Sequence, residues 1–183
     1  ALNFERSGNA TATIAAVAQG EESAAVTVDA DPIDDSVIAF RRFSQFQGAI
    51  LKDSTPLANV TAAALTYSNN LERITTIRSD GKIDGADQTV ASLSGNIDVR
   101  FADTQLTDLA AAGTPVELSF EYTISPFEFL KFTAHKVHLP KAKLPVSGPG
   151  GVQASFNFQG AKDAAEGQML TIMLRNDIAS YTS

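Results

Sequence analysis

Val90 to Ile124 reads V-A-S-L-S-G-N-I-D-V-R-F (90–101), A-D-T-Q-L-T-D-L-A-A-A-G (102–113) and T-P-V-E-L-S-F-E-Y-T-I (114–124). Apolar and polar residues alternate in the first and third parts, which is the two-residue period of a β-strand with one buried face. The stretch therefore predicts two strands with polar outer faces. The residues expected on the buried faces are Leu93, Ile97, Val99, Phe101, Val116, Leu118, Phe120 and Tyr122.

The middle part has the spacing of a short helix of about two to three turns. Asp103 is a suitable N-cap, and Gly113 stands where a left-handed C-cap is expected. Between them Leu106, Leu109 and Ala110 make a narrow apolar stripe. We expect this helix to lie on the apolar face of the sheet that the neighbouring strands form.

Alternation continues in the C-terminal half, where residues 127–139, 152–158 and 170–174 predict three more strands. Together with the strands expected earlier in the chain, this predicts a mainly β fold. We expect a β-sandwich or barrel-like domain with one short flanking helix.

Composition limits the possible functions. The chain has 183 residues, no cysteine and a formal net charge of −7. Without cysteine there are no disulfides, no thiolate metal sites and no cysteine nucleophile. The negative charge argues against a protein that grips nucleic acid through its phosphates, because such surfaces need clustered Lys and Arg. We find no membrane-span or secretory-signal pattern, and the initial Ala is compatible with a sequence that begins part-way through a longer polypeptide.

The N-terminal section, residues 1–35, is expected to be distinct from a main β domain of residues 36–183. Leu2 and Phe4, a turn at residues 7–9 and the alternation that follows predict a hairpin. Its sequence has a short echo later in the chain, which favours the tail of a preceding, related domain. The alternative is an N-terminal extension.

The segment from residue 37 to residue 88 is less regular. Residues 37–46 predict an irregular, bulged strand, and residues 47–52 and 58–67 predict a hairpin closed by the turn at 53–56. Ser68 to Gln88 is then a long connection, and connections of about twenty residues inside a compact domain are uncommon and usually functional.

Residues that might carry chemistry fit simpler explanations. His135 and His138 stand three apart in a strand, which does not favour a shared metal. The segment 80–85 (D-G-K-I-D-G) resembles the start of a calcium loop, but Lys82 stands where an oxygen ligand is required.

Two further candidates also lack support. The Gly-rich segment 147–151 precedes a strand rather than a helix, so it predicts a turn and not a phosphate cradle. Glu117 and Glu121 share a strand face, but exposed polar positions explain them better than an acid–base pair. We therefore predict no catalytic residue, no metal, no cofactor and no enzymatic activity.

Charge is unevenly distributed along the chain. Residues 29–35 are acidic, whereas Lys131, Lys136, Lys141 and Lys143 make a basic region. Each is most simply a solvated loop or edge. An acidic end and a basic end are also what a head-to-tail assembly needs.

Five segments resemble the tail tube (major tail) proteins of long-tailed bacteriophages in their order and spacing, over roughly Phe43 to Tyr181. None of these segments is chemically diagnostic by itself. They are L-T-Y-S-N-N-L-E-R (65–73), D-G-A-D (84–87), G-N-I-D-V-R-F-A-D-T (95–104), L-P-V-S-G-P-G-G-V (144–152) and F-N-F-Q (156–159).

The resemblance implies a virion structural protein, assembled in the host bacterial cytoplasm, whose β domains close into a ring of six units. Rings stack into a tube that conducts the genome and meets the tape measure, terminator and distal tail proteins. No membrane is involved. The long connection would then be an inter-ring loop, with Asn69, Asn70, Asp80, Gly81, Asp84, Gly85 and Asp87 as its candidate residues.

Phage DNA is expected to pass through the bore without tight binding, because a mildly acidic lining repels the phosphates. The candidate lumen-lining residues are Ser94, Asn96, Asp98, Glu117, Ser119 and Glu121. The alternative is that these residues face the outside of the tube. The ring can contain six single-domain or three two-domain copies.

Two other functions are compatible with the sequence. One is a tube subunit of a contractile or secretion apparatus, which shares the architecture. The other is a monomeric carbohydrate- or receptor-binding β-sandwich, which needs exposed aromatic residues grouped around a groove. The aromatic residues here stand mostly on the buried phase of the strands, which favours the tail tube.

Overall fold

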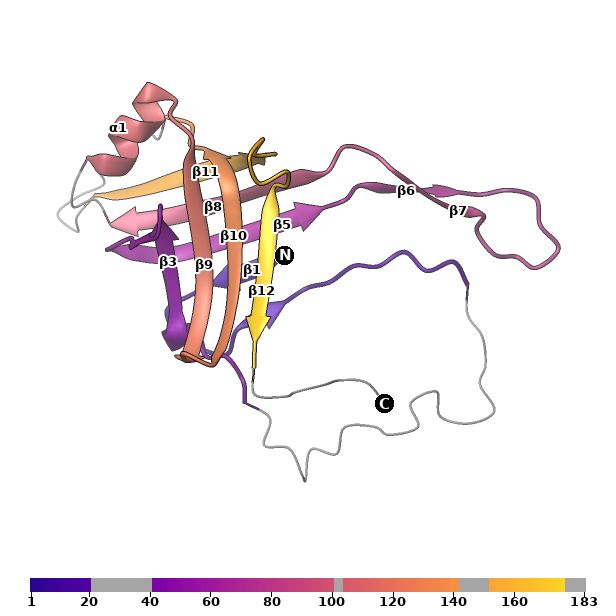
Figure 1. The fold of residues 1–183 in the computed structure, drawn as a ribbon, viewed down its shortest axis with the longest axis horizontal. Helices are drawn as coiled ribbons and strands as arrows, with labels where there is room; N and C mark the ends of the chain where they lie inside the picture. The colour runs from indigo at the N-terminus through magenta and orange to yellow at the C-terminus, as the bar shows by residue number, and fades with distance from the viewer. Residues whose placement is uncertain (21–40, 101–103, 142–151, 177–183) are drawn as a thin grey trace.

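Two crossing layers of antiparallel strands build the protein (Figure 1), for which a computed structural model describes residues 1–20, 41–100, 104–141 and 152–176. The first layer contains β5 (Val60–Ser68), β8 (Ser92–Arg100) and β11 (Gln153–Ala161). The second contains β3 (Gly48–Lys52), β9 (Val116–Ser125), β10 (Glu128–His138) and β12 (Leu170–Arg175). The predicted mainly β fold with one short helix is confirmed for the described residues.

Strand β10 connects the two layers. Its residues 129–134 pair with β9 on one side and with β12 on the other, whereas Lys136 to His138 pair with β11. The register of the β9 pairing shifts between Ala134 and Val137, which marks a bulge. A bulged strand that switches sheets is the usual way to turn the corner of an orthogonal sandwich. The hydrogen-bonded path is therefore continuous, in the order β2-β1-β5-β8-β11-β10-β9-β3-β4.

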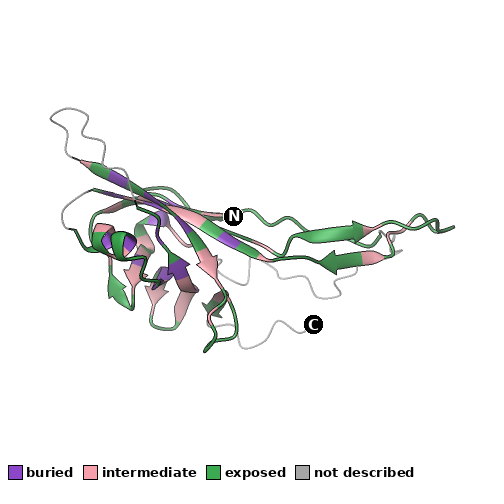
Figure 2. Ribbon diagram, turned by 90° about the horizontal axis from the view of Figure 1, so that it is seen from above, coloured by how far each residue is buried: buried purple, intermediate pink, exposed green. Residues whose placement is uncertain are grey.

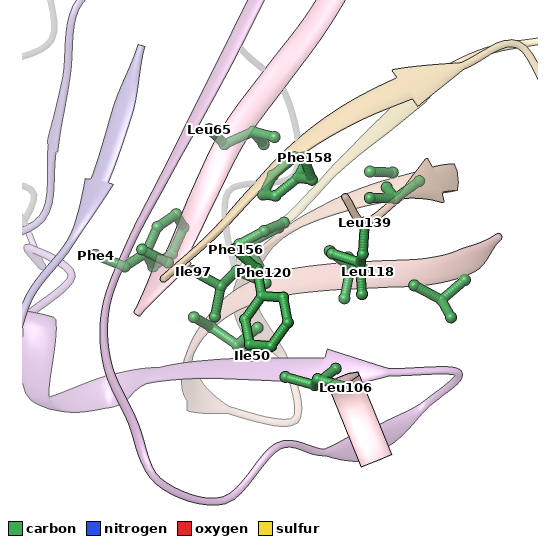
Figure 3. Packing of buried hydrophobic residues seen from close by; sticks show 14 of the residues in the cluster. Phe4, Ile50, Leu65, Ile97, Leu106, Leu118, Phe120, Leu139, Phe156 and Phe158 are labelled. Atoms are coloured by element: carbon green, nitrogen blue, oxygen red, sulfur yellow. The ribbon is translucent and has the colours of Figure 1, made fainter. Parts of the chain in front are cut away.

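The core lies between the layers and is made by the alternating residues of β8, β9 and β11. Ile97, Leu118 and Phe120 have no exposed surface, and Phe156 and Phe158 are 2% and 1% exposed. Figure 3 shows these side chains directed into the same space. The predicted buried faces of the strands at 92–100 and 116–122 are confirmed, while Phe101 lies outside the described residues.

The N-terminal hairpin is present as β1 (Leu2–Phe4) and β2 (Thr11–Ala12), which pair with Leu2 opposite Ala12. Strand β1 also pairs with β5, so the hairpin extends the first layer. The Phe4 ring stacks on the Tyr122 ring with centroids 4.8 Å apart. The division into residues 1–35 and 36–183 stays a prediction.

A buried polar group fastens this hairpin to the body. Gln45, 7% exposed, donates from Nε2 to the Asn3 carbonyl (2.9 Å) and accepts at Oε1 from the Glu5 amide (3.1 Å). The Tyr122 hydroxyl donates to the same Oε1 at 2.9 Å. Each polar atom of the amide is thus satisfied, as burial requires.

The helix, α1 (Gln105–Ala112), lies at one end of the sandwich in Figure 1 and contributes Leu106 and Ala110 to the core. Gly113 ends it in the left-handed conformation (φ 66°), as predicted. The N-cap residue is Thr104 rather than the predicted Asp103, and its side chain makes no capping hydrogen bond.

Two expectations for residues 43–67 are wrong. Residues 45–47 form a 3-10 helix (η1, Gln45–Gln47), which Ser44 and Gln47 close with a capping box, rather than the end of a bulged strand. Residues 47–52 and 58–67 do not pair with each other. The turn at Asp53 and Ser54, both with positive φ, joins β3 to the two-residue β4 (Thr55–Pro56) instead, and β5 joins the other layer.

Candidate assembly surfaces

The long connection is an arm that projects from the body (Figures 1 and 2). Its two strands, β6 (Leu71–Ile74) and β7 (Gly85–Gln88), pair in register from Leu71–Gln88 to Ile74–Gly85. At the root, Asn70 has a positive φ of 48°, and its Nδ2 donates to the Val90 carbonyl at 2.7 Å. The predicted long connection is thus a two-stranded hairpin with a fixed root.

The arm tip is held by one arginine. Arg78 donates from Nε and Nη2 to the two carboxylate oxygens of Asp80 (2.9 and 2.8 Å) and from Nη1 to Asp84 (2.7 Å). These hydrogen bonds lower the pKa of the Asp80 carboxyl below its usual value. Both carboxylates of the calcium-like segment therefore serve a structural ion pair, and Gly81 supplies the positive φ (67°) of the turn.

The predicted inter-ring residues occupy three places on the arm. Asn69 and Asn70 lie at its root, Asp80, Gly81 and Asp84 at its tip, and Gly85 and Asp87 in β7. Exposed apolar side chains also lie on the arm: Leu71 is 40%, Val90 83% and Ile77 107% exposed. The only sequence signal for Ile77 is an apolar residue inside a polar connection.

The predicted lining residues of β8 face outward from the first layer. Ser94, Asn96 and Asp98 pair across the ladder with Gln159, Asn157 and Ser155 of β11. Asn96 donates to the Asp98 carboxylate over 3.4 Å. This outer face is polar and, apart from Asp98 and Arg100 in β8, uncharged over these two strands.

The predicted lining residues of β9 pair with basic and hydroxyl side chains of β10. The Glu121 carboxylate lies 4.0 Å from Lys131 Nζ, and Glu117 lies 3.6 Å from His135 Nδ1. Ser119 lies between them, only 1% exposed, with its hydroxyl 3.4 Å from that of Thr133. The two glutamates therefore have exposed atoms, whereas Ser119 does not present its hydroxyl to solvent in the protomer.

Strand β12 is the free edge of the second layer. Among the described residues it pairs with β10 alone. Ile172, Met173 and Leu174 are 59%, 52% and 57% exposed. Edge strands normally carry charged residues or prolines that block further pairing, and exposed apolar side chains here do the opposite. The sequence predicts this strand but not that its apolar residues are exposed.

The acidic character of the chain comes from one segment. Six of its 21 acidic residues, and none of its 14 Lys and Arg, stand in residues 21–40, so the other residues carry 15 acidic and 14 basic side chains. This segment, with the predicted acidic run at 29–35, lies outside the described residues, as do residues 142–151 with Lys143. The two candidate lining faces are close to neutral rather than acidic.

Comparison with known proteins identifies the family. The sequence profile of the phage tail tube proteins matches residues 1–160. The chain belongs to the phage tail tube protein family. It is therefore a structural subunit of a virion tail. A comparison with curated proteins found no match in sequence.

One solved structure adds support for the fold of this tail tube protein. A chain from the virion of a native gene transfer agent particle superposes with a TM-score of 0.50 at 15% identity, covering 69% of this chain and 95% of that one. A chain from the tail of an empty gene transfer agent particle with C6 symmetry gives a TM-score of 0.45 at 13% identity, covering 65% and 84%.

The described part of the tail tube protein offers little for other chemistry. No three His, Asp, Glu or Cys side chains within it are grouped to hold a metal ion. No helix among these residues is long and apolar enough to cross a membrane. The exposed aromatic residues Phe46, Tyr67 and Phe127 come from η1, β5 and the β9–β10 turn.

Proposed function

We propose that copies of the tail tube protein join edge to edge into rings, and that the rings stack into a tube through which phage DNA passes. The observation that carries this proposal is the free edge of β12. Its outward amide and carbonyl groups and three exposed apolar side chains offer both hydrogen bonds and burial to another strand.

Within the described part of the chain, the layer that contains β12 has no further strand at either end. At its other end, β4 has only two residues and pairs with only the last two residues of β3, Leu51 and Lys52. A layer with two unlike free edges can join a copy of itself heterologously, and such contacts close into a ring when the rotation allows. Edges joined around a ring give a continuous barrel without free edges.

The bore of this tube would let DNA pass without tight binding. Holding a duplex requires clustered Lys and Arg that displace counterions from its phosphates. Glu121 and Glu117 accompany Lys131 and His135 on the outer face of β9 and β10, and the outer face of β8 and β11 carries mostly amides and hydroxyls. Either face suits a non-adhesive lining, so Asn96, Asp98 and the two glutamates remain proposed lumen residues.

The arm is proposed to reach the adjacent ring, because it lies outside the body and leaves Ile77 bare. The ends of the tube would meet the tape measure, terminator and distal tail proteins. Assembly is proposed in the host bacterial cytoplasm, and the protein is proposed to have no catalytic role.

The experiment compares wild-type protein with Ile172→Lys and Leu174→Lys by negative-stain microscopy and sedimentation. A lysine on an edge strand opposes pairing because its charge would be buried. We expect tubes from the wild type and folded, unassembled protomers from both variants. The matched control is Ala111→Lys on the exposed side of α1, which should assemble normally. Tubes of undiminished yield from both edge variants would refute the role of β12.

A further inference from the structure

The folded sheet leaves an apolar groove where its two ends fail to meet. One side of the groove is β3 with the short β4, and the other is β1 with the start of β5. A cavity of about 580 Å³ opens there. The larger apolar side chains of its lining include Phe4, Phe46, Ile50, Leu57 and Val60.

Core residues form the floor of the groove, and an exposed aromatic side chain stands beside them. Phe4, Ile50 and Ala63 are core residues of 5%, 9% and 4% exposure, whereas Phe46 at the rim is 87% exposed. A mostly apolar concavity of this size is within the range of about 300–1,000 Å³ that binding sites have. Because the lining also includes the exposed residues Glu5 and Arg6, the groove has an apolar floor and a charged border.

The arm tip presents an apolar side chain that could enter such a groove. Ile77 touches nothing in its own protomer, since its side chain is 107% exposed. The tip around it is fixed in advance by the Arg78 hydrogen bonds to Asp80 and Asp84. The Ile83 amide also donates to the Gln19 carbonyl (3.3 Å), which braces the tip against the N-terminal segment. Such preorganisation lowers the ordering cost of binding.

The arm tip with Ile77, here called the knob, and the groove lie on different parts of the elongated molecule. Figure 1 places the arm tip at one end of the longest axis, whereas β3 and the start of β5 lie toward the other end. Ile77 therefore cannot fill the groove of its own protomer. Complementary surfaces at opposite ends of one chain make a heterologous contact, which repeats along an axis without closing.

We infer that the arm tip of one copy, led by Ile77, docks into the groove between β3 and β5 of a second copy in the next ring. This inference rests on the proposed stacking of rings and names the receiving site. The occupant is a second copy because a tail tube subunit polymerises and because this chain carries both halves of the contact. Docking removes the exposed Ile77 side chain from water and closes the mouth of the groove in the same step.

Cross-linking tests the contact directly, because the chain has no native cysteine. Ile77→Cys and Leu57→Cys are combined in one protein, which is assembled and then oxidised. A disulfide needs Cα atoms within about 7 Å, so it forms only if the arm tip enters the groove. We expect a ladder of covalent oligomers on a non-reducing gel. The single variants should give no ladder, and neither should Ile77→Cys paired with Ala111→Cys.

A second variant measures the energetic role of the knob. Ile77→Lys should raise the critical concentration for tube growth about ten-fold or more, the factor that losing one buried isoleucine side chain produces. Ile77→Val should restore most of the growth. The double-cysteine protein could form tubes and still run as a monomer on a non-reducing gel after oxidation, or form a disulfide within one chain. Either result would overturn the docking site and leave the proposed function intact. A wild-type protein that never assembles would instead overturn the proposed function, and the inference with it.

Discussion

Gly95→Ala should be one of the most damaging small substitutions in this protein. Gly95 lies in β8 on the side that faces the core, opposite Phe158 of β11. A Cβ atom there would lie 2.1 Å from the Ala64 carbonyl oxygen and 2.4 Å from Phe158 Cζ, whereas ordinary contacts are 3.4–4 Å. The phenylalanine ring can rotate away, but the Ala64 oxygen belongs to the neighbouring strand β5 and moves only with its backbone.

The expected cost of Gly95→Ala follows from these two overlaps. Overpacking a core by one methyl group costs about 1–3 kcal/mol, and displacement of a paired strand places this case at about 3 kcal/mol or more. With a urea m-value of about 2 kcal/mol/M, the midpoint of unfolding should fall by about 1.5 M. Far-UV circular dichroism can follow the transition in the dilute, unassembled protein.

Two companion variants separate the causes. Ser94→Ala, next in the strand but on the outer face, should change stability by less than about 0.5 kcal/mol. Gly95→Ala combined with Phe158→Leu should recover only part of the loss, because the smaller side chain relieves the ring overlap and leaves the backbone overlap. An unfolding midpoint for Gly95→Ala equal to the wild type would show that β5 and β8 do not approach as closely as described.

Two further predictions concern a buried hydroxyl and the arm. Burial raises the pKa of Tyr122 to about 12. The stability linked to its neutral hydroxyl should therefore be complete below pH 10 and fall by about 2–3 kcal/mol as the pH rises from 10 to 12. The urea midpoints at pH 8 and 11.5 should differ less in Tyr122→Phe than in the wild type, and an identical difference would contradict this. Deletion of Asp80 to Asp87 should leave the circular dichroism of the body unchanged and stop growth at single rings, because the tip buries little of its own surface; full-length tubes in micrographs would count against the arm.

The strands of the core were predictable because their side chains alternate. In any β fold that buries one side of each strand, the alternating pattern predicts that Leu93, Ile97, Leu118 and Phe120 are buried. The partners of the strands were not predictable in the same way. The turn Asp53–Pro56 does close a hairpin, but its second strand is only β4, and the chain then crosses to the other layer. Local turn chemistry does not reveal how long a hairpin continues.

The 3-10 helix lies in a segment for which the sequence predicts a bulged strand. The helix has only three residues, Gln45–Gln47, which is too short for a periodic apolar pattern to reveal it. Ser44 and Gln47 have the spacing of a capping box. The spacing of these two polar residues is also compatible with an irregular strand, so it does not by itself distinguish a helix from a strand.

The candidate site was predicted as a region rather than as a set of contacts. The length of the connection from Ser68 to Gln88 correctly marked the arm, because long connections usually have a role. The exposure of the β12 edge was not predictable, since an apolar residue has the same letter whether its own chain or another chain covers it. Burial between copies leaves no mark on periodicity.

The central claim is that the free edge of β12 joins neighbouring copies, and a helical reconstruction of the assembled protein by electron cryo-microscopy tests it most directly. The account predicts rings in which β12 of each copy lies about 4.8 Å from a strand of its neighbour, the spacing of a hydrogen-bonded sheet. A tube in which β12 faces solvent, or a protein that stays solitary at millimolar concentration, would contradict it.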